Sequence, residues 1–337
     1  MLLELLPELL LDMLLEHVDA RGLAALECTS RAFARQREPA FSFVSDAQGP
    51  RRCEDAARRQ VERSAEPAAL TTATQSWKQA LRALEHASAA RRGQSVAAAG
   101  QHAALASAAG MRLFTAGVGL ALRDGRLGHG EDAEQTDGPT EVAALRAERV
   151  LAVAASVSHT VALTADGRVF SCGVGDDGQL GLGDQQGSYI PRLCRSLQGT
   201  KVTQIAAGAR HSCAVTDDGS LFTWGSGSFG RLGHGDEEHE FAPRRVATII
   251  EPVAMVAAGE HHSAAVTTSG ALLTFGRGGY GRLGLRDYGR AHMVAVPTRV
   301  TELVGQHVVH AACGSGHTVV VTATGSVWCC GRGEHGR

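Results

Sequence analysis

One segment of this chain recurs at a nearly constant spacing, and this recurrence restricts the fold more than any other feature. Its clearest copy, Val202–Asp236, has the sequence VTQIAAGARHSCAVTDDGSLFTWGSGSFGRLGHGD. The β-prone runs Ser212–Thr216 and Ser220–Trp224 flank an Asp-Gly pair, which predicts a β-hairpin because the turn needs a residue that tolerates positive φ. A glycine-dense loop, Gly225–Gly235, ends the copy.

A histidine marks the start of each copy, just before the predicted hairpin. The marker histidines are His102, His159, His211, His262 and His317, so the steps between them are 57, 52, 51 and 55 residues. The glycines that begin the loops of the last four copies are Gly173, Gly225, Gly276 and Gly331. Self-similarity at about fifty residues is typical of propellers and other repeat architectures. We therefore expect these histidines and glycines to be structural, with each histidine bonding across a turn rather than holding a metal.

The combined pattern resembles a known repeat family. Several copies agree with Gly-x-x-His-Ser/Thr, then a turn that ends in Gly, then Gly-x-Gly-x-x-Gly-Gln/Arg-Leu-Gly, and the first copy is degenerate. This pattern resembles the regulator of chromosome condensation repeat over roughly Val96–Arg337. The resemblance implies a mainly β propeller, and members usually close a ring of seven blades. Four repeats and a fifth that stops at Arg337 predict about four to five blades in an incomplete ring, preceded by a small α-helical region.

The same glycine loops also match the dinucleotide-binding fingerprint. That fingerprint requires a helix directly after the loop, whose N-terminus holds the pyrophosphate. Here Gln/Arg-Leu-Gly and more glycine follow, and all four matches are in phase with the repeat. We therefore expect scaffold loops and no cofactor. The histidine and cysteine spacings suggest no metal site, and no nucleophile motif or catalytic triad is evident, so we expect no enzyme activity.

A leucine-rich unit occupies residues 1–36. Its leucines recur at helical spacing, break at Asp19–Gly22 and then continue, which predicts two helices joined by a turn. This pattern resembles an F-box, the module that docks on the Skp-type adaptor of a cullin–RING ubiquitin ligase. The resemblance implies an adaptor-facing surface formed by Leu6, Pro7, Leu10, Leu14, Leu15, Val18, Leu23 and Leu26. The alternative is a plain helical cap on the propeller, and Thr29-Ser30 stand where many F-boxes have Val-Cys.

The remaining composition bears on domains and location. Residues 37–93 alternate basic and acidic groups and are predicted to be a charged helical linker, and residues 94–337 are the repeats. Acidic residues interrupt the N-terminal leucines, so we expect neither a signal peptide nor a membrane helix. A net charge of −2 argues against general nucleic-acid binding. Cys172, Cys213 and Cys329 lie in β-prone segments and are predicted to be buried free thiols, which favours the cytoplasm or nucleus.

These features predict a non-catalytic interaction protein. In our main interpretation it is an F-box substrate receptor, in which the N-terminus recruits the adaptor and the propeller binds a client protein of unknown identity. The alternative is guanine-nucleotide exchange on a Ran-type small GTPase, the activity of the founding family member, or a chromatin-associated scaffold. Ultraviolet sensing, a further activity within the family, requires a tryptophan cluster, and the repeats here contain only Trp224 and Trp328.

Overall fold

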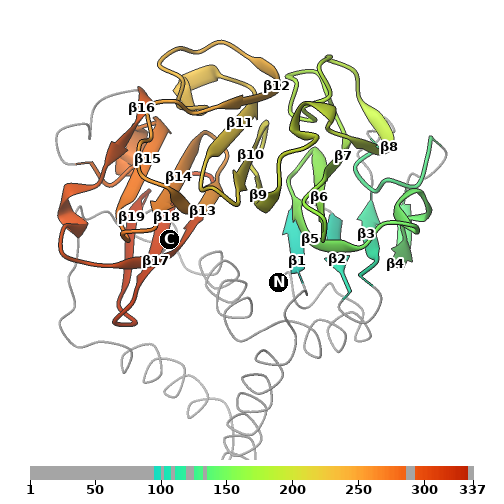
Figure 1. The fold of residues 1–337 in the computed structure, drawn as a ribbon, viewed down its shortest axis with the longest axis horizontal. Helices are drawn as coiled ribbons and strands as arrows, with labels where there is room; N and C mark the ends of the chain where they lie inside the picture. The colour runs from blue at the N-terminus through green and yellow to red at the C-terminus, as the bar shows by residue number, and fades with distance from the viewer. Residues whose placement is uncertain are drawn as a thin grey trace, which may run out of the picture.

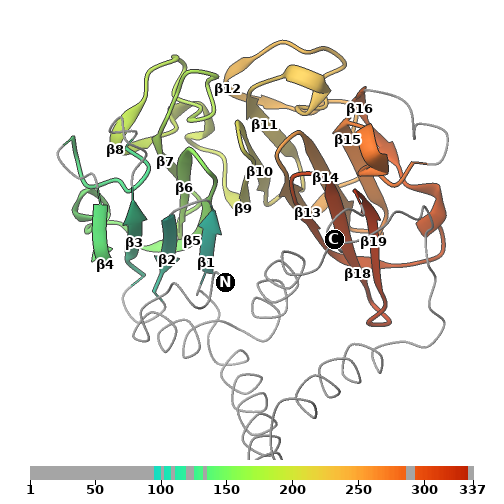
Figure 2. The ribbon, with the colours of Figure 1, turned by 180° about the vertical axis from the view of Figure 1, so that it is seen from behind.

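The computed structural model describes residues 95–99, 102–107, 111–118, 125–131, 135–285 and 293–332. These residues form five antiparallel sheets that lie side by side in an arc (Figures 1 and 2). We refer to the sheets as blades 1 to 5, in chain order. The predicted mainly β propeller of about four to five blades is confirmed. The predicted units 1–36 and 37–93 lie outside the described residues.

Within each blade the strands follow chain order from the centre of the arc outward. Blade 1 contains β1 (Ser95–Ala99), β2 (His102–Ala106), β3 (Leu113–Val118) and β4 (Gln135–Glu141). Blade 2 contains β5 (Val150–Ala155), β6 (His159–Thr164), β7 (Val169–Gly173) and β8 (Ser188–Leu193). Blade 3 contains β9 (Val202–Ala207), β10 (His211–Thr216), β11 (Leu221–Gly225) and β12 (Glu240–Arg245).

Blade 4 contains β13 (Val253–Ala258), β14 (His262–Thr267), β15 (Leu272–Arg277) and β16 (Met293–Arg299), and the described part of blade 5 contains β17 (Val308–Cys313), β18 (His317–Thr322) and β19 (Val327–Gly331). Short 3-10 turns follow the outer strands of three blades: η1 (Ala143–Leu145), η2 (Arg195–Leu197) and η5 (Thr301–Leu303). Two more, η3 (Ser228–Gly230) and η4 (Gly279–Gly281), lie in glycine loops. The loops 174–187 and 226–239 lead to β8 and β12 without an intervening α-helix.

The predicted hairpin of the third repeat is confirmed. β10 and β11 pair from His211↔Gly225 to Val215↔Leu221. The turn between them contains Gly219 at φ 78°, a value that glycine adopts without strain. The amide of Asp217 also donates to the Lys201 carbonyl at 2.9 Å, which fixes the turn to the entry of β9.

The hydrophobic core is divided among the junctions between neighbouring blades. At the junction of blades 2 and 3, Val161, Leu163 and Val169 pack against Ile205, Ala214 and Trp224. Similar clusters fill the other three junctions. Because β6, β10 and β14 each lie between two such clusters, all six residues of each are buried. This explains why the second strand of a repeat shows no polar alternation in the sequence.

Blade 5 differs because, among the described residues, only one face of its sheet is covered by another blade. β18 alternates between buried and half-buried residues, and Val327 on β19 is 62% exposed. Cys172 and Cys213 are buried as predicted, but the prediction for Cys329 was wrong because its side chain is exposed. The side chains of β19 alternate between the two faces, so Cys330 is covered while Cys329 is not.

Candidate protein-binding face

A chain of buried hydrogen bonds joins the blades through the marker histidines. Each ring Nε2 lies within hydrogen-bond distance of the hydroxyl that follows the marker histidine of the next blade. The pairs are His102–Thr160 at 3.0 Å and His159–Ser212, His211–Ser263 and His262–Thr318, each at 2.8 Å. We expected a bond across a turn, and Nδ1 of His159 makes one with the Ser156 hydroxyl at 2.7 Å, but the Nε2 bonds connect two sheets. They hold neighbouring blades in register.

The tautomer of these histidines follows from what their partners donate. The Ser263 hydroxyl donates its one proton to the Arg231 carbonyl at 2.8 Å. Thr160, Ser212 and Thr318 donate in the same way to the carbonyls of Arg126, Gln179 and Arg282. Because a hydroxyl has one proton to give, each can only accept from the histidine. The proton of these neutral rings is therefore on Nε2.

Burial keeps these rings neutral. His159, His211 and His262 have no exposed surface, and His102 is 4% exposed. Desolvation is the main cause that lowers the pKa of His102 to about 4 and those of His159 and His262 to about 3. The pKa of His211 is also lowered, first by burial and then by the charge of Arg231. Neutral rings are poor general acids at neutral pH, and their burial keeps substrate away.

The marker glycines explain how the histidines fit. Gly173, Gly225, Gly276 and Gly331 pair with the marker histidine of the same blade. At Gly225, φ is 103° and an added Cβ would lie 2.6 Å from the Arg210 carbonyl oxygen. At Gly208, an added Cβ would lie 2.3 Å from Cε1 of His211. A side chain at either position would clash, at Gly225 with the Arg210 backbone and at Gly208 with the His211 ring, so glycine is required at both.

Buried arginines add a second set of bonds between blades. Arg231 donates from Nε to the Ser228 carbonyl and from Nη1 to the Glu260 carbonyl of blade 4, at 2.8 and 3.0 Å. Arg282 bonds in the same way to Gly279 and to Ser315 of blade 5. Blade 2 has Gln179 at this position, and there the Ser158 hydroxyl donates to Ala209 of blade 3 instead, at 3.0 Å. The histidine bonds and these arginine or serine bonds join neighbouring blades, and we call them together the frame.

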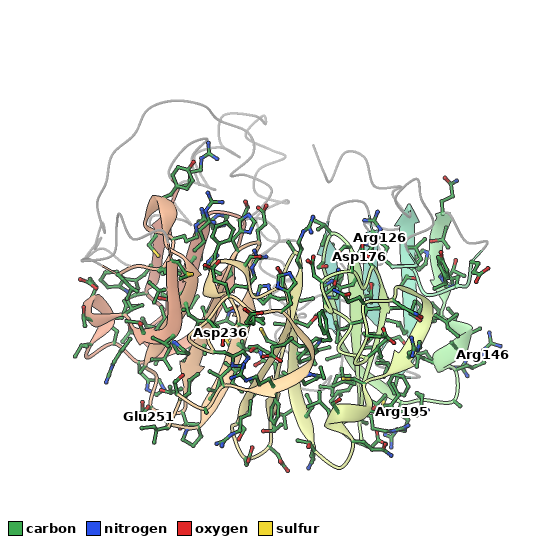
Figure 3. The ribbon with its side chains drawn as sticks, turned by 90° about the horizontal axis from the view of Figure 1, so that it is seen from above. Arg126, Arg146, Asp176, Arg195, Asp236 and Glu251 are labelled. Atoms are coloured by element: carbon green, nitrogen blue, oxygen red, sulfur yellow. The ribbon has the colours of Figure 1, made fainter. Side chains whose placement is uncertain are left out.

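The frame places one set of loops on one face of the arc, which we call the loop face. It comprises the turns 156–158, 208–210, 259–261 and 314–316 and the glycine loops 174–187, 226–239 and 278–285. Figure 3 shows Arg126 and Asp176 toward this face, and Arg195 and Glu251 toward the opposite one. Each described glycine loop of blades 2 to 4 carries one residue at its tip, Asp177, Phe229 or Tyr280.

Two of these tips are aromatic residues held in the left-handed region. Phe229 has φ 63° and Tyr280 has φ 64°, which is uncommon for bulky side chains. The Arg277 guanidinium lies 4.8 Å from the centroid of Phe229, and Arg231 lies 5.8 Å from it. Around Tyr280 the corresponding distances are 4.9 Å to Arg332 and 5.6 Å to Arg282. Cation–π attraction therefore helps to hold both rings in place.

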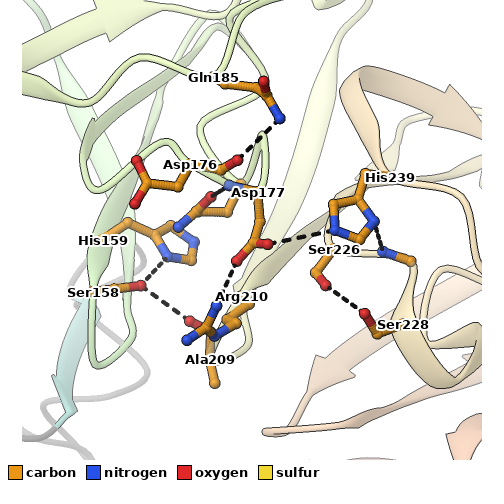
Figure 4. A network of polar contacts seen from close by, with 12 residues as sticks. Ser158, His159, Asp176, Asp177, Gln185, Ala209, Arg210, Ser226, Ser228 and His239 are labelled. Carbon is orange, nitrogen blue, oxygen red and sulfur yellow. Dashed lines mark hydrogen bonds and ion pairs between the residues drawn. The ribbon is translucent and has the colours of Figure 1, made fainter.

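The tip between blades 2 and 3 is polar instead. Asp177 lies 3.0 Å from Nη1 of Arg210 and 3.5 Å from Nε2 of His239, so it links the two blades (Figure 4). His239 Nδ1 in turn accepts from the Gly227 amide at 3.4 Å. One junction of the loop face is therefore neutralised by an ion pair, while the next two carry stacked arginines.

The structure separates the predicted site residues into two groups. The marker residues form the buried frame described above. The adaptor-facing residues Leu6, Pro7, Leu10, Leu14, Leu15, Val18, Leu23 and Leu26 lie outside the described residues, and their role stays a prediction. Sequence reasoning missed Phe229, Tyr280 and Arg277. The available signal was a bulky residue at the variable position directly before the third glycine of the Gly-x-Gly-x-x-Gly loop.

Comparisons with known proteins agree with the repeated blades. The RCC1-like domain family matches residues 56–337. The chain belongs to this family. The match begins inside the segment that we predicted to be a linker, 37–93. In the part of the chain that the structure describes, no group of histidine, cysteine or acidic side chains is arranged to hold a metal, and no helix is long and apolar enough to cross a membrane.

Relatives of this RCC1-like chain include proteins of different kinds. It is 36% identical over 244 residues to the Arabidopsis thaliana ultraviolet-B receptor UVR8, covering 72% of this chain and 54% of that protein. It is also 36% identical over 241 residues to the human E3 ubiquitin-protein ligase HERC2, covering 71% of this chain and 5% of that protein. The chain thus spans about half the length of UVR8 and a small part of HERC2.

Solved structures of similar fold include Prp20p of Saccharomyces cerevisiae, described together with its binding properties to Gsp1p and histones. That structure is 25% identical, with a TM-score of 0.62, over 71% of this chain and 57% of Prp20p. Human WBSCR16 is 26% identical, with a TM-score of 0.61, over 72% of this chain and 62% of that one.

Proposed function

We propose that this chain is a non-catalytic interaction protein whose loop face binds a client protein. One observation supports this most directly: the buried frame repeats from junction to junction, while the exposed tips differ. Asp177, Phe229 and Tyr280 occupy equivalent loop positions on the same face, yet differ in charge and shape. Loops that vary on a rigid scaffold are where proteins place binding residues.

We further propose that residues 1–36 bind a Skp-type adaptor, which would make the chain a substrate receptor of a cullin–RING ubiquitin ligase. The support is the leucine pattern of an F-box at the N-terminus of a chain whose other part is an interaction scaffold. The mechanism would be burial of an apolar helical surface in a groove of the adaptor. The ubiquitin transfer step would belong to other subunits. The free cysteines of the described residues fit the cytoplasm or nucleus as the site of action.

The test is binding of the full chain to a purified Skp-type adaptor. The wild type should retain the adaptor, and the double substitution Leu14→Asp, Leu15→Asp should abolish this binding because it places two charges on the buried surface. Ile250→Asp is the matched control, since Ile250 is 96% exposed on the face opposite the loop face. If the wild type does not bind, the adaptor role is excluded.

A second candidate is guanine-nucleotide exchange on a Ran-type GTPase. It is supported by the similarity to Prp20p, which has binding properties to Gsp1p. The measurement is release of a fluorescent guanine nucleotide from a Ran-type GTPase with and without the full chain. Acceleration that saturates with the amount of chain would support exchange, and an unchanged release rate would exclude it.

A further inference from the structure

The stacked arginine Arg277 carries a charge that no described residue neutralises. Its guanidinium lies over Phe229, and no carboxylate of the described residues comes within 4.0 Å of it. Arg277 is half-buried, so its charge is partly shielded from water. The contrast with Arg210 is direct. Arg210 is on the same face, one blade earlier, and its guanidinium is 3.0 Å from Asp177.

Positive charge also accumulates around Arg277. Arg231, Arg282 and Arg332 occupy the same two junctions, and each lies against Phe229 or Tyr280. Two carboxylates lie at this group and both are already bonded: Glu260 to His261 at 3.1 Å and to the Ser315 hydroxyl, and Glu237 to the Phe229 amide at 2.7 Å. Burial lowers the pKa of Arg282, and the charge of Arg277 lowers it further. The arginines therefore repel one another, and an anion placed among them would relieve that repulsion.

Stacking leaves Arg277 suited to bind a carboxylate. A guanidinium that rests on an aromatic ring uses its flat face, while its N–H donors point outward in the plane of the group. Those donors match the two oxygens of a carboxylate, which a planar guanidinium can bind through two parallel bonds. The ring also restricts the motion of the side chain, so less conformational freedom is lost on binding.

We propose that the surface formed by Phe229, His261, Arg277 and Tyr280 binds an acidic segment of a protein partner, with Arg277 as the central carboxylate ligand. The proposal rests on the proposed function in that it assigns a chemical class to the client of the loop face. The partner segment would carry aspartate or glutamate for Arg277, and an apolar side chain beside it for Tyr280, which is 50% exposed.

The extent of the surface favours an acidic protein segment over nucleic acid. A phosphate backbone carries charge along its whole length and needs a continuous basic track. The loops of blades 2 and 3 on the same face instead carry Asp176 and Glu238, which pair with no basic side chain of the described residues. These carboxylates would repel a strand that extended past the basic junctions. A short acidic segment, by contrast, fits within the basic junctions.

The experiment uses the full chain and a fluorescent twelve-residue peptide of alternating Asp, Glu and Leu, measured by fluorescence anisotropy. A matched peptide carries Asn and Gln in place of the acids. We expect binding of the acidic peptide alone, weakened by added salt. Arg277→Gln should reduce the affinity about tenfold, because one charge-assisted contact is lost. Arg210→Gln is the matched control on the same face, and it should leave the affinity within about twofold, because Asp177 already neutralises Arg210.

Three results would overturn the proposal: no binding of the acidic peptide, equal binding of the amide peptide, or equal losses from Arg277→Gln and Arg210→Gln. A single-stranded RNA of matched charge provides a further arm. If it binds more tightly than the peptide and displaces it, the surface is a nucleic-acid site and the proposal is wrong. Adaptor binding by the same preparations is measured in parallel. Because Leu14→Asp, Leu15→Asp and Arg277→Gln change different parts of the chain, loss of either activity alone shows which of the two proposals has failed.

Discussion

Removing a single buried hydroxyl, by Ser263→Ala, tests whether the histidine bonds hold the blades together. The Ser263 hydroxyl accepts from His211 Nε2 and donates to the Arg231 carbonyl, both at 2.8 Å, and all three residues are buried. With alanine at this position, the buried donor His211 Nε2–H and the buried Arg231 carbonyl both lose their hydrogen-bond partner. Each such loss destabilises a protein by about 1–3 kcal/mol, so the two losses together should lower the free energy of unfolding by about 2–6 kcal/mol.

The assay is urea unfolding of the full chain, followed by circular dichroism and by tryptophan fluorescence, to which Trp224 in the adjoining junction contributes. Ser269→Ala is the matched control, because the Ser269 hydroxyl bonds to Glu251 at the surface, and its effect should stay below about 0.5 kcal/mol. Ser263→Thr should keep most of the stability, since Thr160 and Thr318 make the same two bonds in their blades. If Ser263→Ala shifts the unfolding midpoint no more than Ser269→Ala does, the histidine bonds do not stabilise the junctions.

Three further predictions concern the same frame. The unfolded chain protonates its histidines near pH 6.5, while folded His102, His159 and His262 stay neutral down to about pH 4, 3 and 3. The unfolded state therefore binds more protons. The free energy of unfolding, measured with urea, should fall as the pH drops from 6.5 to 4, by up to about 1.4 kcal/mol per pH unit for each histidine. A flat profile over that range would contradict burial of neutral rings. Gly208→Ala should destabilise more than Gly208→Ser in urea unfolding, because a serine hydroxyl can donate to Nδ1 of His211 as Ser156 does to His159 at 2.7 Å. In native-state alkylation with N-ethylmaleimide, peptide mapping should show Cys329 modified and Cys194 and Cys213 protected, since these two are buried and burial raises their pKa to about 12. Modification of Cys213 at the rate of Cys329 would show that the blades open.

The sequence was sufficient for the repeat, the hairpins and the class of fold, because these depend on local patterns. Asp217-Asp218-Gly219 between two β-prone runs determines its own turn, and the fifty-residue period follows from the spacing of the histidines. The partner of each histidine was beyond sequence reasoning. The last four copies each have a hydroxyl beside their own histidine, and only the three-dimensional stagger of the blades shows that the bond goes to the hydroxyl of the next copy. Cys329 was mispredicted for a related reason, since it takes the strand position of the buried residues Ser171 and Thr223 while the cover over it differs.

The candidate surface was less predictable than the frame, because it depends on residues from two neighbouring blades. Phe229 is at a loop tip of blade 3, Arg277 is the last residue of the third strand of blade 4, and His261 lies in a turn of blade 4. Each looks ordinary in its own repeat. Phe229 and Arg277 become a unit only when the frame brings two neighbouring blades together at a fixed offset, with their guanidinium and ring 4.8 Å apart.

Because the tips rest on the buried bonds, the same frame can carry loop tips of different charge. The carbonyl of Arg231 holds Ser263, and the side chain of Arg231 also lies beneath Phe229, so one residue couples the buried hydrogen bonds to the exposed tip. At the preceding junction Gln179 takes its place, and the tip is Asp177, paired with Arg210. Exchange of one tip therefore changes the charge that a partner meets, while the histidine bonds below remain the same. A substitution at a tip should alter which segment binds without unfolding the blades, whereas a substitution such as Ser263→Ala should loosen every tip that its junction supports.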